Sequence, residues 1–499
     1  MKEKVLIPTR GVIALDIINS LNSMGMETLL MYSPEDSLSL PVKLADRSYK
    51  FYSSRLEDSY LDSEAILEKA REVQADYIHP GYGFLAESPE FAKLCRDNNI
   101  RFVGPESSVL AAVEDKIKLR ETAASLGLPV LKFSELIKSP LDFEACNSNF
   151  NYPIIIKPLK GSGGRSIRVA DFRREAQEQI ANLLKREENT QNGVFFEEFR
   201  PYARHIEIPF FRDIKDNILF LPEIESSIQR RFQKIFQESP APNLDERLRA
   251  CLYERSQVLL KKINYVGLGY VEFIVENNEC LFSEINPTFQ INTLISEVHL
   301  TSNFLKKQVV ISRGELLHHV HGVKIVKPKH HVLLVSLMAE DPYNNFLPST
   351  GQISHFFHYS TIRNVFKTTL YTGARVTPMY DPFIGKILTY AVERQNAIND
   401  MRIFLDNIII RGIRTNLVFL KHLLENGDLR NGGTIIDFLH LKFDFSKLKN
   451  TEEESIVAAA LLAANFHIDN RKKNYKAKLE KMKQPGLLKR LFGGFRGAQ

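Results

Sequence analysis

The chain has 499 residues, of which 44% are hydrophobic and 25% are charged, and 66 Lys and Arg residues against 60 Asp and Glu residues give a formal charge of +6. This composition is that of a globular protein and excludes a disordered or fibrous chain, and at roughly 100–200 residues per domain the length predicts about three domains. Residues 471–499 contain ten basic residues and one acidic residue, which leaves 56 basic and 59 acidic residues elsewhere. Because the excess charge belongs to this tail, we expect no nucleic-acid partner.

The N-terminus, the apolar runs and the cysteines favour a cytoplasmic protein. The first residues, MKEKV, lack the apolar region of a signal peptide. The longest apolar run, residues 456–464, has nine residues, whereas a membrane-spanning helix needs about 20. Cys95, Cys146, Cys251 and Cys280 lack any metal-ligand spacing, so we interpret them as ordinary thiols of a reducing compartment.

The first hundred residues alternate strand and helix patterns. Strands are predicted at residues 5–8, 26–32 and 77–79, with helices at residues 13–21 and 63–74. This alternation indicates a parallel sheet with crossover helices. Since such sheets bind ligands beyond the carboxyl ends of their strands, the loop PGYGF at residues 80–84 is expected at a ligand-binding edge.

The next segment combines an apolar strand with a glycine-rich loop. A helix is predicted at residues 115–126 and a strand at residues 152–157, which ends in a lysine. The loop KGSGGR at residues 160–165 follows, and its backbone N–H groups are suited to contact phosphate. A plain surface hairpin is an equally good interpretation of this loop by itself.

Two further predicted strands, residues 270–275 and 280–286, carry carboxylates, and the turn at residues 276–278 makes them an antiparallel hairpin. Glu284 and Asn286 project on one face of their strand, because side chains alternate with a period of two. Glu272 and Glu284 would repel each other unless a cation such as Mg²⁺ bridges them. Two exposed carboxylates on a solvated face are the alternative.

Residues 331–445 mix predicted strands at 332–336 and 384–389 with predicted helices at 397–407 and 417–426. An apolar helix is predicted at residues 453–466, before the basic tail.

Nine motifs, in order, resemble those of the biotin carboxylases of the ATP-grasp superfamily. TRGVIA at residues 9–14 is similar to NRGEIA, and HPGYGFLAE at 79–87 is similar to HPGYGFLSE. The others are DK at 115–116, the strand and glycine-rich loop at 152–168, RHIE at 204–207, QRRFQK at 229–234, AEDP at 339–342, YDPFIGK at 380–386 and GIRTN at 412–416.

This resemblance implies an α/β fold that is α+β in its middle part. The expected order is an N-terminal parallel-sheet domain (residues 1–112), an ATP-grasp domain (113–327) with a lid at about 131–200, a mixed α/β C-terminal domain (328–445), and a helix with a basic tail (446–499). It also implies ATP and Mg²⁺ (or Mn²⁺) as cofactors.

The resemblance further implies individual roles. Lys116 and Lys157 would hold ATP phosphates, as mobile point charges suited to that task, and the loop with Gly161, Gly163 and Gly164 would cover them. The other expected positions are the adenine hinge Glu197, Glu198 and Phe199, with His205 and Gln229 nearby, and the magnesium site Glu272, Glu284 and Asn286.

In biotin carboxylases, a glutamate deprotonates bicarbonate, which attacks ATP to give carboxyphosphate, and the carbon dioxide released is captured by biotin. This chain resembles the family in the anion-binding Lys234 but has Thr288 for the bicarbonate-binding arginine, Asn292 for the base glutamate and Ser336 for the arginine that steadies the ureido oxygen. An asparagine accepts no proton near neutral pH. Bicarbonate-dependent biotin carboxylation is therefore expected to be very slow.

Three hypotheses follow: a divergent biotin carboxylase, an ATP-grasp ligase that activates a different carboxylate as an acyl phosphate, and a non-catalytic ATP-binding paralogue that partners an active carboxylase. Biotin would be a substrate on a separate carrier protein, and a carboxyltransferase subunit is a second candidate partner. Homodimers are common in the family, although Asp16 stands where relatives carry an interface arginine. The tail is suited to contact an acidic partner or an anionic membrane surface, or is simply solvated.

Overall fold

A computed structural model describes residues 2–147, 150–160, 166–186 and 192–448. The chain divides by its internal contacts into two units, Met1–Phe443 and Asp444–Gln499. The expected helix at residues 453–466 and the basic tail lie outside the described residues. No helix among the described residues combines the length and the apolar character needed to cross a membrane.

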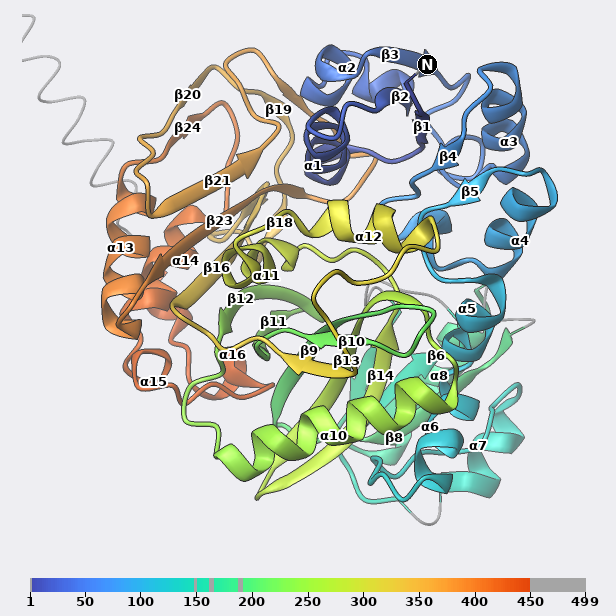
Figure 1. Cartoon of the computed structure of the whole chain (residues 1–499). Helices are drawn as coiled ribbons and strands as arrows, with labels where there is room; N and C mark the ends of the chain where they lie inside the picture. The colour runs from blue at the N-terminus through green and yellow to red at the C-terminus, as the bar shows by residue number, and fades with distance from the viewer. Residues whose placement is uncertain (1, 148–149, 161–165, 187–191, 449–499) are drawn as a thin grey trace, which may run out of the picture. The chain divides into compact units, whose positions relative to one another are not determined.

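The N-terminal part is the expected parallel sheet (Figure 1). Its five parallel strands have the order β3-β2-β1-β4-β5. The strands are β1 (Lys4–Ile7), β2 (Glu27–Tyr32), β3 (Arg47–Lys50), β4 (Tyr77–Ile78) and β5 (Arg101–Phe102), and the helices are α1 (Gly11–Asn22), α2 (Leu40–Leu44), α3 (Ser63–Glu72), α4 (Pro89–Asp97) and α5 (Ser107–Glu114), with short 3₁₀ segments at Pro34–Asp36 and Phe84–Glu87.

Strand β1 explains why this sheet forms. Val5 and Ile7 belong to one buried apolar cluster, whereas Leu6 belongs to another. Successive side chains of a strand point to opposite faces, so apolar helices cover both faces of the sheet, as is typical of parallel sheets. Two of these helices begin at capping side chains: Asp62 accepts from the Ala65 N–H before α3, and Ser88 accepts from the Phe91 N–H before α4.

A small three-stranded antiparallel sheet with the order β7-β6-β8 follows. The predicted strand at residues 152–157 is confirmed as β6 (Ile154–Pro158), between β7 (Arg168–Ala170) and β8 (Val194–Glu198). The helices in this part of the chain are α6 (Lys116–Ser125), α7 (Pro140–Asn147) and α8 (Arg173–Leu184).

A ten-stranded sheet forms the centre of the molecule, with the main order β14-β13-β9-β11-β12-β16-β23-β21. The antiparallel pairing of β12 with β16 joins the middle part of the chain to the C-terminal part. Its strands are β9 (Arg204–Arg212), β10 (Ile218–Phe220), β11 (Ile224–Arg230), β12 (Gln233–Ser239), β13 (Gly267–Glu276), β14 (Glu279–Asn286), β15 (Val323–Ile325), β16 (His331–Met338), β21 (Asn364–Thr368) and β23 (Phe383–Ala391).

The predicted carboxylate-bearing hairpin is confirmed as β13 and β14. The two strands pair antiparallel, and Glu272 lies directly opposite Glu284. Asn277 and Asn278 form the turn with φ of 48° and 65°, a left-handed conformation that asparagine adopts more readily than most residues. The alternative of two exposed carboxylates is wrong for Glu272, which is 1% exposed.

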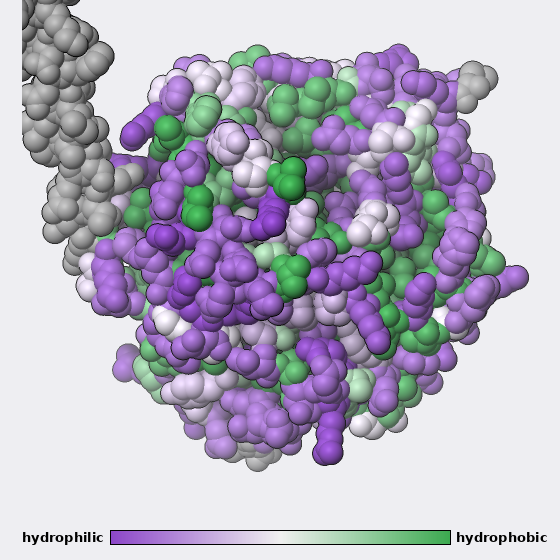
Figure 2. Space-filling model, turned by 60° about the vertical axis from the view of Figure 1, so that its left-hand side comes forward, coloured by the Kyte–Doolittle hydropathy of each residue, from purple (hydrophilic) through white to green (hydrophobic). Residues whose placement is uncertain are grey.

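The remaining elements are short or helical. The short strands are β17 (Glu340–Asp341), β18 (Leu347–Pro348), β19 (Gly351–Gln352), β20 (His355–Phe357), β22 (Arg375–Val376) and β24 (Ile409–Arg411). The helices are α10 (Glu246–Lys262), α11 (Thr293–Leu300), α12 (Phe304–Ser312), α13 (Arg394–Asp406), α14 (Leu417–Glu425), α15 (Gly427–Arg430) and α16 (Phe438–Leu441). Hydrophilic residues cover most of the face in Figure 2, with hydrophobic residues between them, as on ordinary protein surfaces.

Candidate active site

One cavity of about 560 Å³ draws its lining from three separate parts of the chain. The N-terminal sheet contributes Arg10, after β1, and Tyr82 and Glu87, after β4. These residues lie beyond the carboxyl ends of parallel strands, which is where the loop at residues 80–84 was expected. At Gly81, which has φ of +81°, an added Cβ would lie 2.7 Å from a Thr9 side-chain atom, so this crossing requires glycine.

The first end of the cavity, the Glu197 end, is formed by Lys157, Glu197, Glu198, His205 and Gln229. Lys157 on β6 forms an ion pair with Glu197 on the neighbouring strand β8. Glu197 is 1% exposed, and the combined pull of Arg120, Lys157 and Lys116 lowers its pKa even though burial acts to raise it. Glu197 is therefore a buried anion that fixes the position of a lysine.

Arg120 is a member of this cluster that was not predicted. Its side chain is fully buried, 3.0 Å from Glu197 Oε2, and it donates to the Lys116 carbonyl. The available signal was its position four residues after Lys116 and three before the buried Ala123, on the inner face of α6. An arginine on an inward stripe indicates a buried anionic partner.

Replacing Arg120 by Met is expected to lower the free energy of unfolding by about 3 kcal/mol, because it removes one cation from a buried carboxylate. The loss stays at the low end of the range for buried ion pairs, since Lys157 still pairs with Glu197. Urea unfolding measures the change. Arg174→Met, which removes an exposed ion pair to Glu178, is the control and should cost at most about 0.5 kcal/mol; equal effects of both variants would contradict the prediction.

Lys116 and the glycine-rich loop are the other residues that were predicted to bind phosphate. Lys116 begins α6 and is close enough to Glu284 and Lys157 for both charges to affect it, while burial lowers its pKa. Gly161, Gly163 and Gly164 lie outside the described residues. The two predicted lysines are therefore brought close together.

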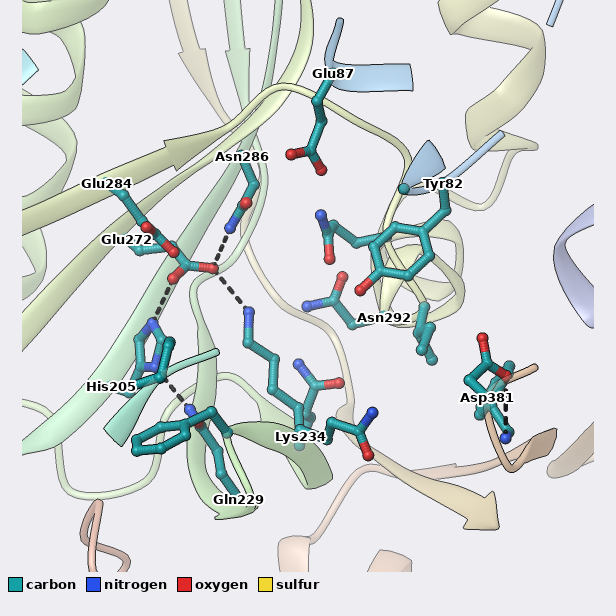
Figure 3. A pocket seen from close by; sticks show the side chains of 18 of the residues that line it. Tyr82, Glu87, His205, Gln229, Lys234, Glu272, Glu284, Asn286, Asn292 and Asp381 are labelled. Atoms are coloured by element: carbon teal, nitrogen blue, oxygen red, sulfur yellow. Dashed lines mark hydrogen bonds and ion pairs between the residues drawn. The ribbon is translucent and has the colours of Figure 1, made fainter. Parts of the chain in front are cut away.

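His205 connects two predicted groups (Figure 3). Its Nε2 lies 2.8 Å from Glu272 Oε2, and its Nδ1 lies 2.8 Å from Gln229 Nε2. Gln229 Nε2 also donates to the Ser226 carbonyl, which identifies this atom as the amide nitrogen. His205 Nδ1 therefore accepts a hydrogen bond, and the ring is a neutral imidazole that donates from Nε2 to the carboxylate.

The predicted metal residues come together as expected, on β13 and β14. Glu272 accepts hydrogen bonds from Asn286 Nδ2 at 2.6 Å and from Lys234 Nζ at 2.7 Å. Burial acts to raise the Glu272 pKa, but the charge of Lys234 and the hydrogen bonds from Lys234 and His205 outweigh it and hold the pKa well below its usual range. Two carboxylates beside a side-chain amide offer the oxygen ligands that Mg²⁺ and Mn²⁺ prefer, so these residues fit such an ion.

A second group of lining residues, the Asn292 end, comprises Tyr82, Lys234, Gln290, Asn292 and Asp381. Figure 3 shows Asn292, Tyr82 and Asp381 on the other side of Lys234 from His205 and Gln229. Lys234 lies between two buried carboxylates, because its Nζ is 2.7 Å from both Glu207 and Glu272. Asn292 Nδ2 donates to the other oxygen of Glu207 at 3.0 Å. The anion-binding lysine of the family thus has its charge balanced within the protein.

The other two substituted positions are buried beside this end and do not line the cavity. The Ser336 hydroxyl donates to the Lys234 carbonyl at 2.9 Å, and the Thr288 hydroxyl accepts from Gln290 Nε2 at 3.2 Å. Sequence reasoning missed Glu207, although it is the last residue of the RHIE motif, and Glu87, the last of HPGYGFLAE.

A buried ion pair holds the segment that carries Asn292. Lys386 on β23 is 1% exposed, and its Nζ lies 2.7 Å from Asp16 Oδ2 and 3.3 Å from the Ile291 carbonyl. Asp16, on α1, is 8% exposed. The residue at the family's interface-arginine position is therefore paired inside this chain.

His79 supports the loop that carries Tyr82, and it makes stability depend on pH. Its Nδ1 accepts from the Gly81 N–H at 3.2 Å, and complete burial lowers its pKa from 6.5 to about 3. Between those two pKa values the unfolded chain binds a proton at His79 that the folded chain does not bind. The contribution of His79 to stability is therefore fully present above pH 6.5 and is lost as the pH falls toward 3.

When the pH is lowered from 7.5 to 5, the free energy of unfolding is expected to fall by about 2 kcal/mol because of His79. His79→Asn, which keeps an acceptor for Gly81, should remove this part of the pH dependence, as measured by urea unfolding at both pH values. His440→Asn is the control, because His440 has an exposed side chain. An unchanged pH dependence in the His79 variant would contradict the prediction.

Three family models match almost the whole described chain. They are biotin carboxylase, N-terminal domain, at residues 1–110; carbamoyl-phosphate synthase L chain, ATP binding domain, at 115–320; and biotin carboxylase C-terminal domain, at 335–440. Together they define an ATP-binding domain of ATP-grasp type between two biotin carboxylase domains. Among solved structures, the biotin carboxylase domain of Hydrogenobacter thermophilus 2-oxoglutarate carboxylase, in complex with MgADP, ADP and bicarbonate, has a TM-score of 0.83 and 29% identity, covering 88% of this chain and 97% of that one.

The chain belongs to the biotin carboxylase family. It is 34% identical to the biotin carboxylase of Pseudomonas aeruginosa over 453 residues, which cover 90% of this chain and 100% of that protein. It is 33% identical over 468 residues to the mitochondrial methylcrotonoyl-CoA carboxylase subunit alpha of Rattus norvegicus, covering 92% of this chain. The aligned region spans 65% of the length of that larger relative.

Proposed function

We propose that the protein is an ATP-dependent ligase that binds Mg·ATP as biotin carboxylases do but has an altered acceptor site. The observation that carries the proposal is that one cavity is lined both by the family's charged residues and by a substituted catalytic position. The Glu197 end keeps the family's charged residues, whereas the family's three anion-handling residues at the other end are Thr288, Asn292 and Ser336.

The Glu197 end supports nucleotide and metal binding. Lys116 and Lys157 supply positive charge suited to phosphates, and Glu197 holds Lys157 in place. Glu272 and Glu284 offer carboxylates from adjacent strands, where Mg²⁺ or Mn²⁺ would neutralise the charge that develops on the transferred phosphoryl group. Gln229 and His205 hold the Glu272 carboxylate in position.

The Asn292 end supports only slow carboxylation of biotin. Asn292 has no basic atom to deprotonate bicarbonate, a loss of roughly 10²–10⁴-fold. Lys234 is already balanced by Glu207 and Glu272, and Thr288 and Ser336 place hydroxyls where relatives have cations. Each missing cation at developing negative charge costs a factor of about 10²–10³.

A second candidate function is the activation of another carboxylate as an acyl phosphate. The observation that favours it is that the three substituted catalytic positions lie at or beside the Asn292 end, while Lys157, Glu272 and Glu284 all line the same cavity. In either reaction the substrate acid would gain its reactivity from the γ-phosphate of ATP.

The test is ATP hydrolysis by the purified full-length protein. Bicarbonate would be supplied with and without free biotin, and a panel of small carboxylates would be assayed separately. Turnover with a carboxylate other than bicarbonate supports the second function, and slow turnover that needs bicarbonate and biotin supports the first. ATP binding with no turnover would contradict both and indicate a non-catalytic paralogue.

Candidate partners follow from the family. A separate biotin carboxyl carrier protein and a carboxyltransferase subunit are proposed for the carboxylase reaction. A homodimer is also proposed, since the Hydrogenobacter thermophilus relative was crystallised as a biotin carboxylase domain dimer. In this chain, a dimer would form without a charge contribution from Asp16, which pairs internally with Lys386.

A further inference from the structure

Strand β15 leaves one edge of the central sheet open. It pairs parallel with β10 on one side, and no other strand of the described residues pairs with it. The Gly322 carbonyl and the Val326 N–H form hydrogen bonds with β10 at 2.8 Å and 2.9 Å. Residues of a strand turn their backbone groups alternately to one neighbour and to the other. The N–H and C=O groups of Val323 and Ile325 therefore face the open edge.

The apolar side chains of β15 continue a buried face of the sheet. In the register of the pair, Val323 lies beside Ile218, and Ile325 lies beside Phe220. Ile218 and Phe220 are fully buried core residues, whereas Val323 is 40% exposed and Ile325 is 45% exposed. A further strand with apolar residues at every second position would cover these two side chains and extend the core face.

Basic residues surround this edge. Residues 316–331 contain three lysines, five histidines and no acidic residue. Lys324 is the central residue of β15, and Lys327 and Lys329 follow it; all three are exposed, and none forms an ion pair within the described part of the chain. Lys307 on α12 is also close, because burial and the charge of Lys324 together lower the Lys307 pKa.

The acidic side chains of the flanking segments are engaged elsewhere. Asp213, in the turn before β10, is buried and accepts backbone N–H groups. In the same turn Asp216 pairs with Arg212, and Glu315, after α12, lies 3.8 Å from Arg313. The lysines of the edge therefore create a positive field that favours an acidic partner.

The charge of the edge selects among the strands that it could receive. Lysine on an edge strand opposes pairing between like chains, and a second copy of β15 would bring another lysine close to Lys324. A strand that carries carboxylates meets complementary charge instead.

We propose that β15 is a docking edge for an extended acidic segment of a partner protein, in which apolar residues alternate with Asp or Glu. The segment adds to the sheet as a further strand, a known mode of peptide recognition. Its backbone pairs with Val323 and Ile325, its apolar side chains cover theirs, and its carboxylates lie on the face of Lys324.

The test measures amide hydrogen exchange of the full-length protein, by mass spectrometry at short labelling times, with the peptide acetyl-TVEVET-amide. The controls are the lysine counterpart TVKVKT and the acidic peptide N-methylated at its four central residues, which lacks the N–H groups of a strand. Saturating acidic peptide is expected to slow exchange at Val323 and Ile325 at least about fivefold, because these amides gain hydrogen bonds. It should bind at least about tenfold more tightly than the lysine peptide. Unprotected amides at these two residues overturn the inference.

A charge reversal assigns the effect to β15. Lys324→Glu is expected to weaken binding of the acidic peptide about tenfold, because repulsion replaces attraction between neighbouring strands. Lys185→Glu, exposed at the end of α8, is the matched control and should have no effect, and urea unfolding checks that both variants are folded. Unchanged binding in Lys324→Glu would place the peptide elsewhere, for example on the basic residues 471–499, and overturns the inference.

Other occupants of the edge give different results. Equal binding of the N-methylated peptide would show that charge alone acts, and equal protection by a short DNA duplex would identify a polyanion-binding patch. Protection that increases with protein concentration in the absence of peptide would identify pairing between copies of this chain. Each of these results overturns the inference. None of them depends on the ligase function proposed above, since residues 316–331 contribute no described residue to the cavity.

Discussion

Glu284→Gln is expected to weaken Mg·ATP binding about 100-fold and to remove its dependence on Mg²⁺. The substitution keeps the size of the side chain but removes one of the two carboxylates that lie opposite each other on β13 and β14. A divalent ion held by Glu272 alone loses much of its attraction to the protein, and the loss of one electrostatic group in such a site costs about 10²–10³-fold. Lys116 also loses the favourable charge of Glu284.

The measurement is a fluorescence titration with a labelled ATP analogue at several Mg²⁺ concentrations. Glu254→Gln is the matched control, because Glu254 is exposed on α10 and its replacement should leave binding unchanged. Glu284→Asp, which keeps the charge, should recover part of the affinity. An affinity of the glutamine variant equal to that of the unmodified protein would contradict the magnesium assignment.

Restoring the three family residues together, as Thr288→Arg, Asn292→Glu and Ser336→Arg, is expected to raise biotin-dependent bicarbonate turnover by about 10²–10⁴-fold. The glutamate supplies the missing base. The two arginines supply positive charge that Lys234, balanced by Glu207 and Glu272, provides only weakly.

The single substitution Asn292→Glu serves as the internal comparison. Asn292 Nδ2 donates to Glu207 at 3.0 Å, so a glutamate at this position places two carboxylates side by side and raises the pKa of one of them. We therefore expect the single variant to be less stable than the unmodified protein and little more active. The gain in turnover of the triple variant should exceed the combined gains of the three single substitutions. A folded triple variant that binds ATP but gains no activity would show that the acceptor site has diverged beyond these three residues.

The sequence predicted the elements that depend on local patterns. The parallel N-terminal sheet, the strand that ends in Lys157 and the hairpin with Glu272 opposite Glu284 all follow from apolar alternation and turn residues. The contact of His205 with Glu272 was not predicted, because the resemblance placed His205 and Gln229 near the adenine hinge and no local pattern connects residues that are 67 positions apart.

The charge partners could not be predicted, because each depends on which side chains the tertiary fold places together. Nothing in the motif QRRFQK indicates that Lys234 lies between Glu207 and Glu272. Likewise, the Asp16–Lys386 pair joins α1 to β23 across 370 positions of sequence. The family resemblance identified Asp16 as a substituted position but gave no reason to expect its burial.

The β12–β16 pairing has a consequence for how this protein can be divided. A fragment ending near residue 327 would retain β12, which carries Lys234, but would lose β16 and leave the Phe236–Ser239 edge of the sheet with unpaired backbone groups. Exposed edges of this kind join other chains and lead to aggregation. A fragment of this chain that stops before β16 is therefore expected to aggregate unless another strand covers that edge.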